Sequence, residues 1–243
     1  MHHTDWIKAK REDIRKSIAN CFETRGSGGW HENIITRDML QTLGVEQSID
    51  WDDKPFRSEW KIFKATGRYE TANGDIAMKV ILRTHSGEYV IGTKFFEAKK
   101  IGLRSSRYDA IDRAQLERMQ YLGGHEVLFY SLAQQAPNTA IFGQALCLPT
   151  PVALMLLESG TSALHRASHS FVDCFAHALS GRGLNWSSSQ TRRFDQISRG
   201  VDHAPSFVLT AHVGPMNLEL EPIEAPLDYE PLQELDQGNE LSP

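Results

Sequence analysis

Residues 74–100 read GDIAMKVILRTHSGEYVIGTKFFEAKK, two alternating apolar runs separated by a short polar stretch. Alternation with a period of two predicts two β-strands, and the polar stretch predicts the turn between them. A three-residue hairpin loop typically ends in a glycine with a left-handed backbone, so we expect the loop at 85–87. Thr84 and Glu88 are then the closing pair, and this pair fixes the register of the whole hairpin.

Counting outward from the closing pair places Asp75 directly opposite Glu97, and Asn73 opposite Lys99. Opposed residues share a face, with Cβ atoms about 5 Å apart. Lys99 lies two residues beyond Glu97, on the same face and about 6.5 Å away. Two such carboxylates repel each other unless a cation lies between them, and Mg²⁺ prefers oxygen ligands of this kind. The spacing predicts a Mg²⁺ site, with Mn²⁺ as a substitute, and a lysine that serves a nucleophile or a phosphate.

Both faces of this hairpin carry apolar residues. Ile76, Met78, Val80 and Leu82 point away from the carboxylates and are expected in the core. Tyr89, Ile91 and Phe95 fall on the carboxylate face, so that face should be partly covered as well. A sheet with helices on both sides satisfies both requirements.

The rest of the chain mixes helical and strand patterns. Apolar spacing predicts helices at about 5–23, 34–43, 108–122 and 163–179. Strands are expected at 60–63, 126–133, 145–150 and 207–213, and residues 45–58 are polar and irregular. The expected fold class is therefore α/β or mixed α+β.

Charge divides the chain into a body and a tail. Residues 214–243 contain eight acidic residues and no Lys or Arg, which leaves residues 1–213 with 26 basic and 23 acidic residues, a net charge of +3. We expect a single domain over 1–213 and a flexible acidic, proline-containing tail over 214–243. The tail is interpreted as a solubiliser, a partner-binding segment or a mimic of DNA that folds back over the basic body.

The sequence argues against a membrane-spanning protein, a secreted protein and a protein held by disulfides or a zinc knuckle. No apolar run approaches the roughly 20 residues of a membrane span, and the charged start lacks an apolar signal region. Cys21, Cys147 and Cys174 are far apart and odd in number, so they fit neither a disulfide framework nor a zinc knuckle. We expect a cytoplasmic protein that does not contact a membrane.

The motif of the hairpin resembles the PD-(D/E)xK nuclease superfamily. Gly74-Asp75 and Glu97-Ala98-Lys99 match its signature, with Gly74 in the place of the proline. HENIITRDML (31–40) resembles the preceding helix of the family, and AQLERM (114–119) resembles the following helix. The resemblance covers residues 30–135 and extends loosely to stand-alone bacterial nucleases of restriction and antiphage defence.

The resemblance implies a restriction-endonuclease-like core and a role for each matched residue. Asp75 and Glu97 would hold the metal, with Glu32 as a further ligand directly or through water. Lys99 would serve the nucleophile, and Gln115 would steady the site. The implied activity is Mg²⁺-dependent endonucleolytic cleavage of DNA.

Basic residues near the motif are candidates for phosphate contacts, although each also fits an ordinary solvated surface. They are Lys94, Lys100, Arg104, Arg107 and Arg113. No DNA-targeting module is recognisable elsewhere. A homodimer or a partner protein is compatible with cleavage of both strands. Two alternatives remain open: a catalytically quiet subunit that binds nucleic acid or protein, and a nuclease that acts on RNA.

A second constellation lies in the expected helix 163–179. Its members are spaced four apart and would form one stripe: His165, His169, Asp173 and His177. Such a stripe can bind zinc, contact DNA or a partner, or simply form the polar face of the helix.

Overall fold

The structure is a computed structural model that describes residues 3–51, 55–66, 74–101, 111–120, 124–134, 141–157, 164, 166–197 and 204–233. The helices are α1 (His3–Glu23), the 3₁₀ turn η1 (Arg25–Ser27), α2 (Glu32–Leu43), α3 (Arg113–Gln120), α4 (Thr150–Leu157), α6 (Phe171–Leu179) and α7 (Ser188–Ile197). Among the described residues, no helix combines the length and the apolar character needed to cross a membrane.

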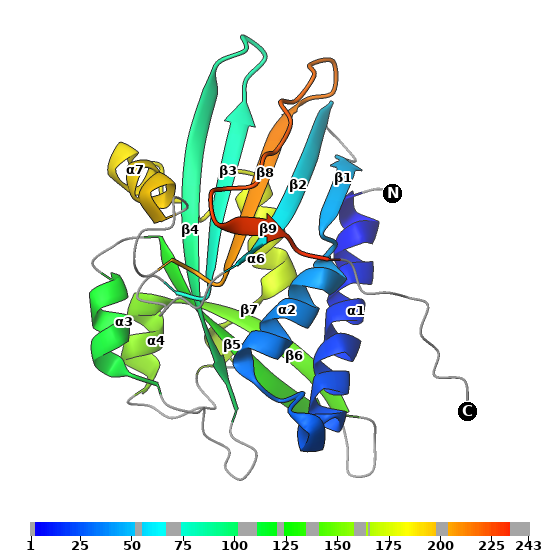
Figure 1. The fold of residues 1–243 in the computed structure, drawn as a ribbon, viewed down its shortest axis with the longest axis vertical. Coiled ribbons are helices and arrows are strands. Elements are labelled where there is room, and N and C mark those ends of the chain that lie inside the picture. The colour runs from blue at the N-terminus through cyan, green and yellow to red at the C-terminus, as the bar shows by residue number, and fades with distance from the viewer. Residues whose placement is uncertain are drawn as a thin grey trace.

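A nine-stranded mixed sheet forms the centre of the molecule (Figure 1). Its strands are β1 (Glu46–Asp50), β2 (Phe56–Ala65), β3 (Ile76–Arg83), β4 (Tyr89–Lys100), β5 (His125–Gln134), β6 (Ile141–Pro149), β7 (His169–Ser170), β8 (Phe207–Pro215) and β9 (Tyr229–Pro231). The strand order is β1-β2-β8-β3-β4-β5-β6-β7, and β9 pairs with β2. β3 runs parallel to β8 and β4 parallel to β5, whereas the other pairs are antiparallel. The predicted α/β class is confirmed.

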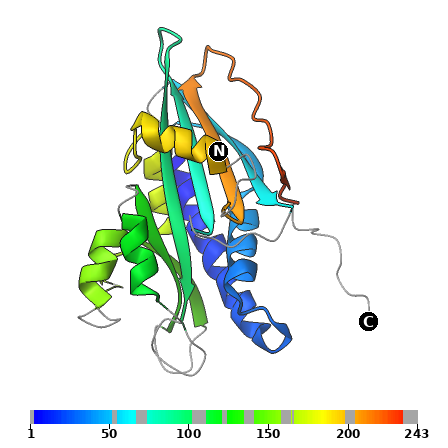
Figure 2. The same cartoon turned by 60° about the vertical axis from the view of Figure 1, so that its left-hand side comes forward.

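Helices cover both faces of the sheet, and Figure 2 shows α3 and α4 on one side of β4 and β5 with α1 and α2 on the other. On the face that α1, α2 and α6 cover, Ile76, Met78 and Phe96 pack in the large core. On the opposite face, Phe95 packs with Phe194 of α7, while β5 and β6 pack against α3 and α4. Apolar residues on both faces of the central strands therefore exclude water from both sides.

The hairpin has the predicted register. Ile76 pairs with Phe96 and Arg83 with Tyr89, and the Thr84 amide donates to the Glu88 carbonyl at 2.8 Å. The turn ends at Gly87 with φ of +85°. Coverage of the carboxylate face stops short of the turn, because Tyr89 is 64% exposed.

β4 extends beyond its partner β3, and this mismatch creates an unusual edge. β3 pairs with β4 only as far as Phe96, whereas β5 follows β4 to Lys100 on the other side. The last residues of β4 therefore have one edge without a neighbouring strand among the described residues. Backbone N–H groups on such an edge need acceptors from elsewhere when they are buried.

The predicted helix at 163–179 is wrong. Residues His169–Ser170 form β7 and pair with β6, and α6 begins only at Phe171. The Ser170 side chain accepts from the Asp173 amide at 3.2 Å, which is an N-cap. An N-cap residue lies outside the helix that it caps, so one helix cannot run through Ser170. The apolar pattern of residues 163–179 is therefore divided at this residue.

The acidic segment at 214–243 is packed in its first part, which differs from the predicted flexible tail. β9 pairs with β2 through Phe63 and Ala65, and both Tyr229 and Leu232 are buried. Apolar residues between the acids provide this attachment. Residues 234–243 lie outside the described part of the chain.

Gly74 should tolerate substitution far less well than Gly87, although both have φ near +90°. A Cβ at Gly74 would lie 2.6 Å from the Phe96 carbonyl oxygen, whereas nothing lies within 4 Å of one at Gly87. Gly87→Ala should cost about 1–2 kcal/mol, the strain of a left-handed alanine. Gly74→Ala should cost about 3 kcal/mol or more, because β3 must also move away from β4. Urea unfolding of both variants measures this difference, and equal losses would contradict it.

Candidate metal-binding and catalytic site

Asp75 lies at the start of β3 and caps the open edge of β4. Its amide donates to the Phe96 carbonyl at 2.8 Å, and its Oδ2 accepts from the Ala98 amide at 2.7 Å. Gly74 permits the close approach that brings the two backbones together here. The carboxylate is therefore fixed on the edge of β4, one residue from Glu97.

Glu32, the first residue of α2, reaches the same edge of β4 from the layer that α1 and α2 form. Its Oε1 accepts from the Lys100 amide at 3.1 Å, the next N–H on this side of β4 after that of Ala98. Trp30 anchors the start of α2 by donating from Nε1 to the Ile101 carbonyl at 2.9 Å. A carboxylate in the first turn of a helix also benefits from the helix dipole.

Glu97 is 2% exposed and is held by two donors. Lys99 Nζ lies 2.6 Å from Glu97 Oε1, and Gln115 Nε2 donates to the same oxygen at 2.9 Å. Gln115 is positioned by the start of α3, where Asp112 Oδ1 accepts from the amides of Ala114 and Gln115. The structure thus brings Asp75, Glu97, Lys99, Gln115 and Glu32 together.

Burial and mutual repulsion disfavour the charged carboxylates. Burial first, and then the Glu97 carboxylate, raise the pKa of Asp75 to about 7, although the Ala98 amide and Lys99 lower it. Burial also raises the pKa of Glu97, despite the adjacent Lys99 ammonium. Burial disfavours the Lys99 ammonium, yet Glu97, Glu32 and Asp75 hold its pKa above the ordinary value. Lys99 therefore stays protonated at neutral pH.

The donor set fits a hard divalent cation. Glu97 Oε2 is buried and has no hydrogen-bond partner among the described residues, although a buried carboxylate oxygen normally has one. Three carboxylates and one ammonium carry a net charge of −2 when all are ionised, which a divalent ion would balance. The oxygens of Glu32, Asp75 and Glu97 do not form a set within 4.8 Å of one another in the described chain. The structure therefore does not place the three predicted ligands in one close set, and the assignment of metal ligands stays a prediction.

The basic residues predicted to contact phosphate are scattered. Lys94 is 3% exposed and lies on the opposite face of β4, where its Nζ pairs with Glu126 Oε1 at 2.6 Å. That prediction is wrong, because a residue three before Glu97 in a strand points to the other side. Arg113 is exposed at the start of α3 and contacts Glu117, while Lys100 is partly buried. Arg104 and Arg107 lie outside the described residues.

The proposed stripe of His165, His169, Asp173 and His177 is not formed. His169 belongs to β7 and the last two to α6, while His165 lies outside the described residues. Arg11 Nη2 lies 2.5 Å from Asp173 Oδ1, and Ser170 Oγ donates to Asp173 Oδ2 at 2.6 Å. The spacing of four has meaning only on one continuous helix.

Two supporting contacts near the site were not predicted. Thr36 of α2 and Tyr130 of β5 share a buried hydrogen bond of 2.8 Å, which fixes α2 against the sheet. His125 is buried with Nδ1 2.8 Å from Thr150 Oγ1, and burial lowers its pKa to about 3. The pairing of β4 with β5 brings Tyr130 and His125 near the motif, and no sequence spacing reveals that pairing.

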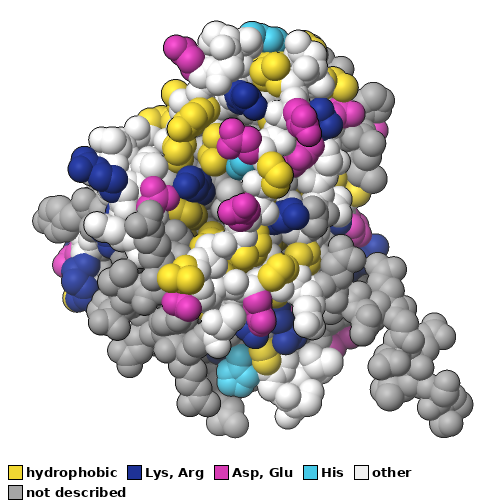
Figure 3. Space-filling model, turned by 45° about the horizontal axis from the view of Figure 1, so that its top comes forward, with side chains coloured by type: hydrophobic (Ala, Val, Ile, Leu, Met, Phe, Trp, Pro, Cys, Tyr) yellow, Lys and Arg dark blue, Asp and Glu magenta, His cyan; other side chains and the backbone are white. Residues whose placement is uncertain are grey.

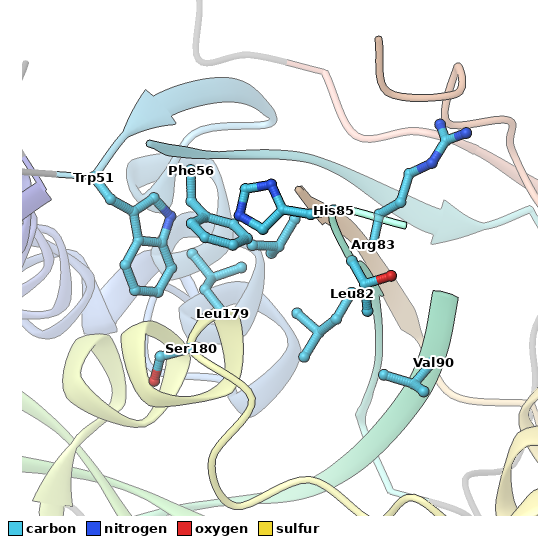
Figure 4. A pocket seen from close by; sticks show the side chains of 10 residues that line it. Trp51, Phe56, Leu82, Arg83, His85, Val90, Leu179 and Ser180 are labelled. Carbon is cyan, nitrogen blue, oxygen red and sulfur yellow. The ribbon is translucent and has the colours of Figure 1, made fainter. Parts of the chain in front are cut away.

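A cavity of about 430 Å³ lies at the other end of the hairpin. Figure 4 shows Trp51, Phe56 and His85 beside Leu82 and Leu179, and its lining contains no carboxylate. The face drawn in Figure 3 intersperses Lys and Arg with Asp and Glu among the described residues, as a solvated surface does. Neither feature belongs to the carboxylate cluster.

Metal-free protein should show the burial of Asp75 in its pH dependence. A carboxyl whose folded pKa is raised binds more protons folded than unfolded, so its contribution falls as pH rises from about 4 to about 7. Asp75→Asn keeps an acceptor for the Ala98 amide and removes the charge. Over this interval the wild type should therefore lose unfolding free energy relative to the variant, by about 1.4 kcal/mol per unit of pKa shift.

Comparing the two proteins cancels titrating groups that do not interact with Asp75, such as His125. Urea unfolding at several pH values in EDTA measures the difference, and Mg²⁺ should reduce it at pH 8 by stabilising the wild type alone. A difference that does not change with pH would contradict the buried, repelled carboxylate.

Comparison of the chain with models of protein families, with curated proteins and with solved structures gives no match.

Proposed function

We propose that the chain is a metal-dependent nuclease that hydrolyses phosphodiester bonds of DNA, built on a restriction-endonuclease-like core. The observation that carries this proposal is the state of Glu97. One of its oxygens is held by Lys99 and Gln115, while the other is buried without a partner among the described residues. A second buried carboxylate, Asp75, raises the local negative charge. This combination favours a cation site over an ordinary ion pair.

Each side chain has a distinct part in the proposed mechanism. Asp75 and Glu97 hold the cation, and the hydrogen bonds from Ala98 and Gln115 fix the directions of the two carboxylates. A bound divalent ion supplies Lewis-acid stabilisation of the phosphate charge. Lys99 is protonated and lies beside the carboxylates, so its ammonium supports stabilisation of a phosphate oxygen rather than removal of a proton.

The substrate class rests on the resemblance of residues 30–135 to the nuclease superfamily. Of the five basic residues predicted to contact phosphate, Lys100 and Arg113 remain candidates among the described residues, since Lys94 is buried on the other face. RNA is a second substrate that the same chemistry would cleave. DNA and RNA oligonucleotides of one sequence distinguish the two.

Cleavage of supercoiled plasmid should require Mg²⁺ or Mn²⁺ and should stop in EDTA. Asp75→Asn and Lys99→Met should each lower the rate on the order of 10²–10³-fold, because the first weakens the hold on the cation and the second removes an ammonium beside the phosphate. Lys79→Met is the matched control. Lys79 is also paired with an acid, Asp195, at 3.0 Å, and lies on the same face of the adjacent strand.

Cleavage that survives both substitutions would assign the activity to a contaminant or to another site. A wild type that binds nucleic acid without cutting DNA or RNA would instead support the catalytically quiet binding subunit.

Gln115→Leu should weaken the site without removing a ligand. The substitution keeps the size of the side chain but loses the donor to Glu97 Oε1. Loss of a residue that orients a metal ligand typically costs about 10- to 100-fold in affinity or activity. A higher Mg²⁺ requirement in the cleavage assay measures the effect. Gln120→Leu, at the exposed end of α3, is the control, and equal behaviour of the two variants would contradict this role.

A further inference from the structure

Four polar side chains meet on the face of the sheet opposite Glu97. They come from neighbouring elements: Lys94 of β4, Glu126 of β5, Cys147 of β6 and Cys174 of α6. Lys94 lies on the same face of β4 as Phe96, which pairs with Glu126. Leu128 lies on the same face of β5 as Glu126 and pairs with Cys147. The register therefore places the first three side chains on one face of adjacent strands. A carboxylate oxygen and two Sγ atoms, one each from Glu126, Cys147 and Cys174, lie within 4.8 Å of one another.

This cluster leaves a ligand atom without a partner. Glu126 Oε1 accepts from Lys94 at 2.6 Å, but Glu126 Oε2 is buried and unpartnered among the described residues. Cys147 is fully buried, and Cys174 is 6% exposed. A buried carboxylate oxygen without a hydrogen bond is costly unless something else binds it.

We propose that Glu126, Cys147 and Cys174 bind Zn²⁺ or another thiophilic divalent cation. Cysteine sulfur and carboxylate oxygen are both zinc ligands, and three protein ligands leave a fourth position for water. This second metal site is proposed independently of the proposed nuclease function.

Charge balance supports this assignment. Without metal, the Lys94 ammonium balances the Glu126 carboxylate. With metal bound, two thiolates and the Glu126 carboxylate carry three negative charges, which the Lys94 ammonium and one divalent cation balance. A neutral cluster avoids the large cost of a net charge in an apolar core.

The two proposed sites differ in the cation that they prefer. Asp75 and Glu97 offer only oxygens, which suit Mg²⁺ and Mn²⁺, whereas the thiolates select softer ions. They lie on opposite faces of the sheet, so one can be occupied without the other. A metal in the thiol site would join β5, β6 and α6 beneath the strand that carries Glu97.

Cadmium is a suitable probe because thiolate ligands give it a charge-transfer absorption in the ultraviolet. The reduced full-length chain is titrated with Cd²⁺ in excess Mg²⁺. We expect one Cd²⁺ per chain and release of about two protons. Cys147→Ser and Cys174→Ser should lose the absorption. Cys21→Ser should keep it, although Cys21 is also buried and lies 3.4 Å from an Asp38 oxygen.

A second measurement uses the wild type alone, in case a cysteine variant does not fold. Zn²⁺ should raise the midpoint of thermal unfolding of the reduced chain, and of Asp75→Asn to the same extent. Absence of thiolate absorption at one equivalent of Cd²⁺ would overturn the proposal. So would absorption that persists in Cys147→Ser, or a Zn²⁺ effect that disappears in Asp75→Asn.

Discussion

The arrangement of the candidate site depends on one mismatch in the sheet: β4 is longer than the strand beside it. Beyond Phe96, the backbone amides of Ala98 and Lys100 have no partner strand among the described residues, and the carboxylates of Asp75 and Glu32 accept from them. Hydrogen bonding of a strand edge thus brings two acids from different layers together. A buried edge amide needs an acceptor, so this requirement holds the acids in place even where their charges repel.

The alternation of β4 then separates two chemistries. Glu97 and Lys99 face one side with Gln115, and Lys94 faces the other with Glu126. Each side contains a lysine 2.6 Å from a glutamate, and in each pair the second carboxylate oxygen is buried without a described partner. What differs is the third group, a carboxylate on one side and thiols on the other. The two sides therefore offer different ligand atoms, and the cations proposed for them differ for that reason.

The sequence predicted the local geometry well and the long-range geometry partly. The glycine of the turn fixed the register, and period-two alternation placed Asp75 with Glu97. Lys94 was predicted near the site because it is close to Glu97 in the sequence. The alternation of a strand already places a residue three positions earlier on the opposite face. The break at Ser170 was missed because a capping serine also fits an amphipathic pattern. The packing of Tyr229 onto β2 depends on a partner strand more than 160 residues earlier, which no local pattern reveals.

Calorimetric titration of the metal-free chain with Mn²⁺ tests most directly whether the acids at the end of the ribbon form a cation site. The account predicts one Mn²⁺ per chain for the wild type and an affinity lower by about 100-fold or more for Glu97→Gln. Glu126→Gln, on the opposite face, should bind Mn²⁺ as the wild type does. A wild type that binds no Mn²⁺, or a Glu97→Gln variant with unchanged affinity, would contradict the account.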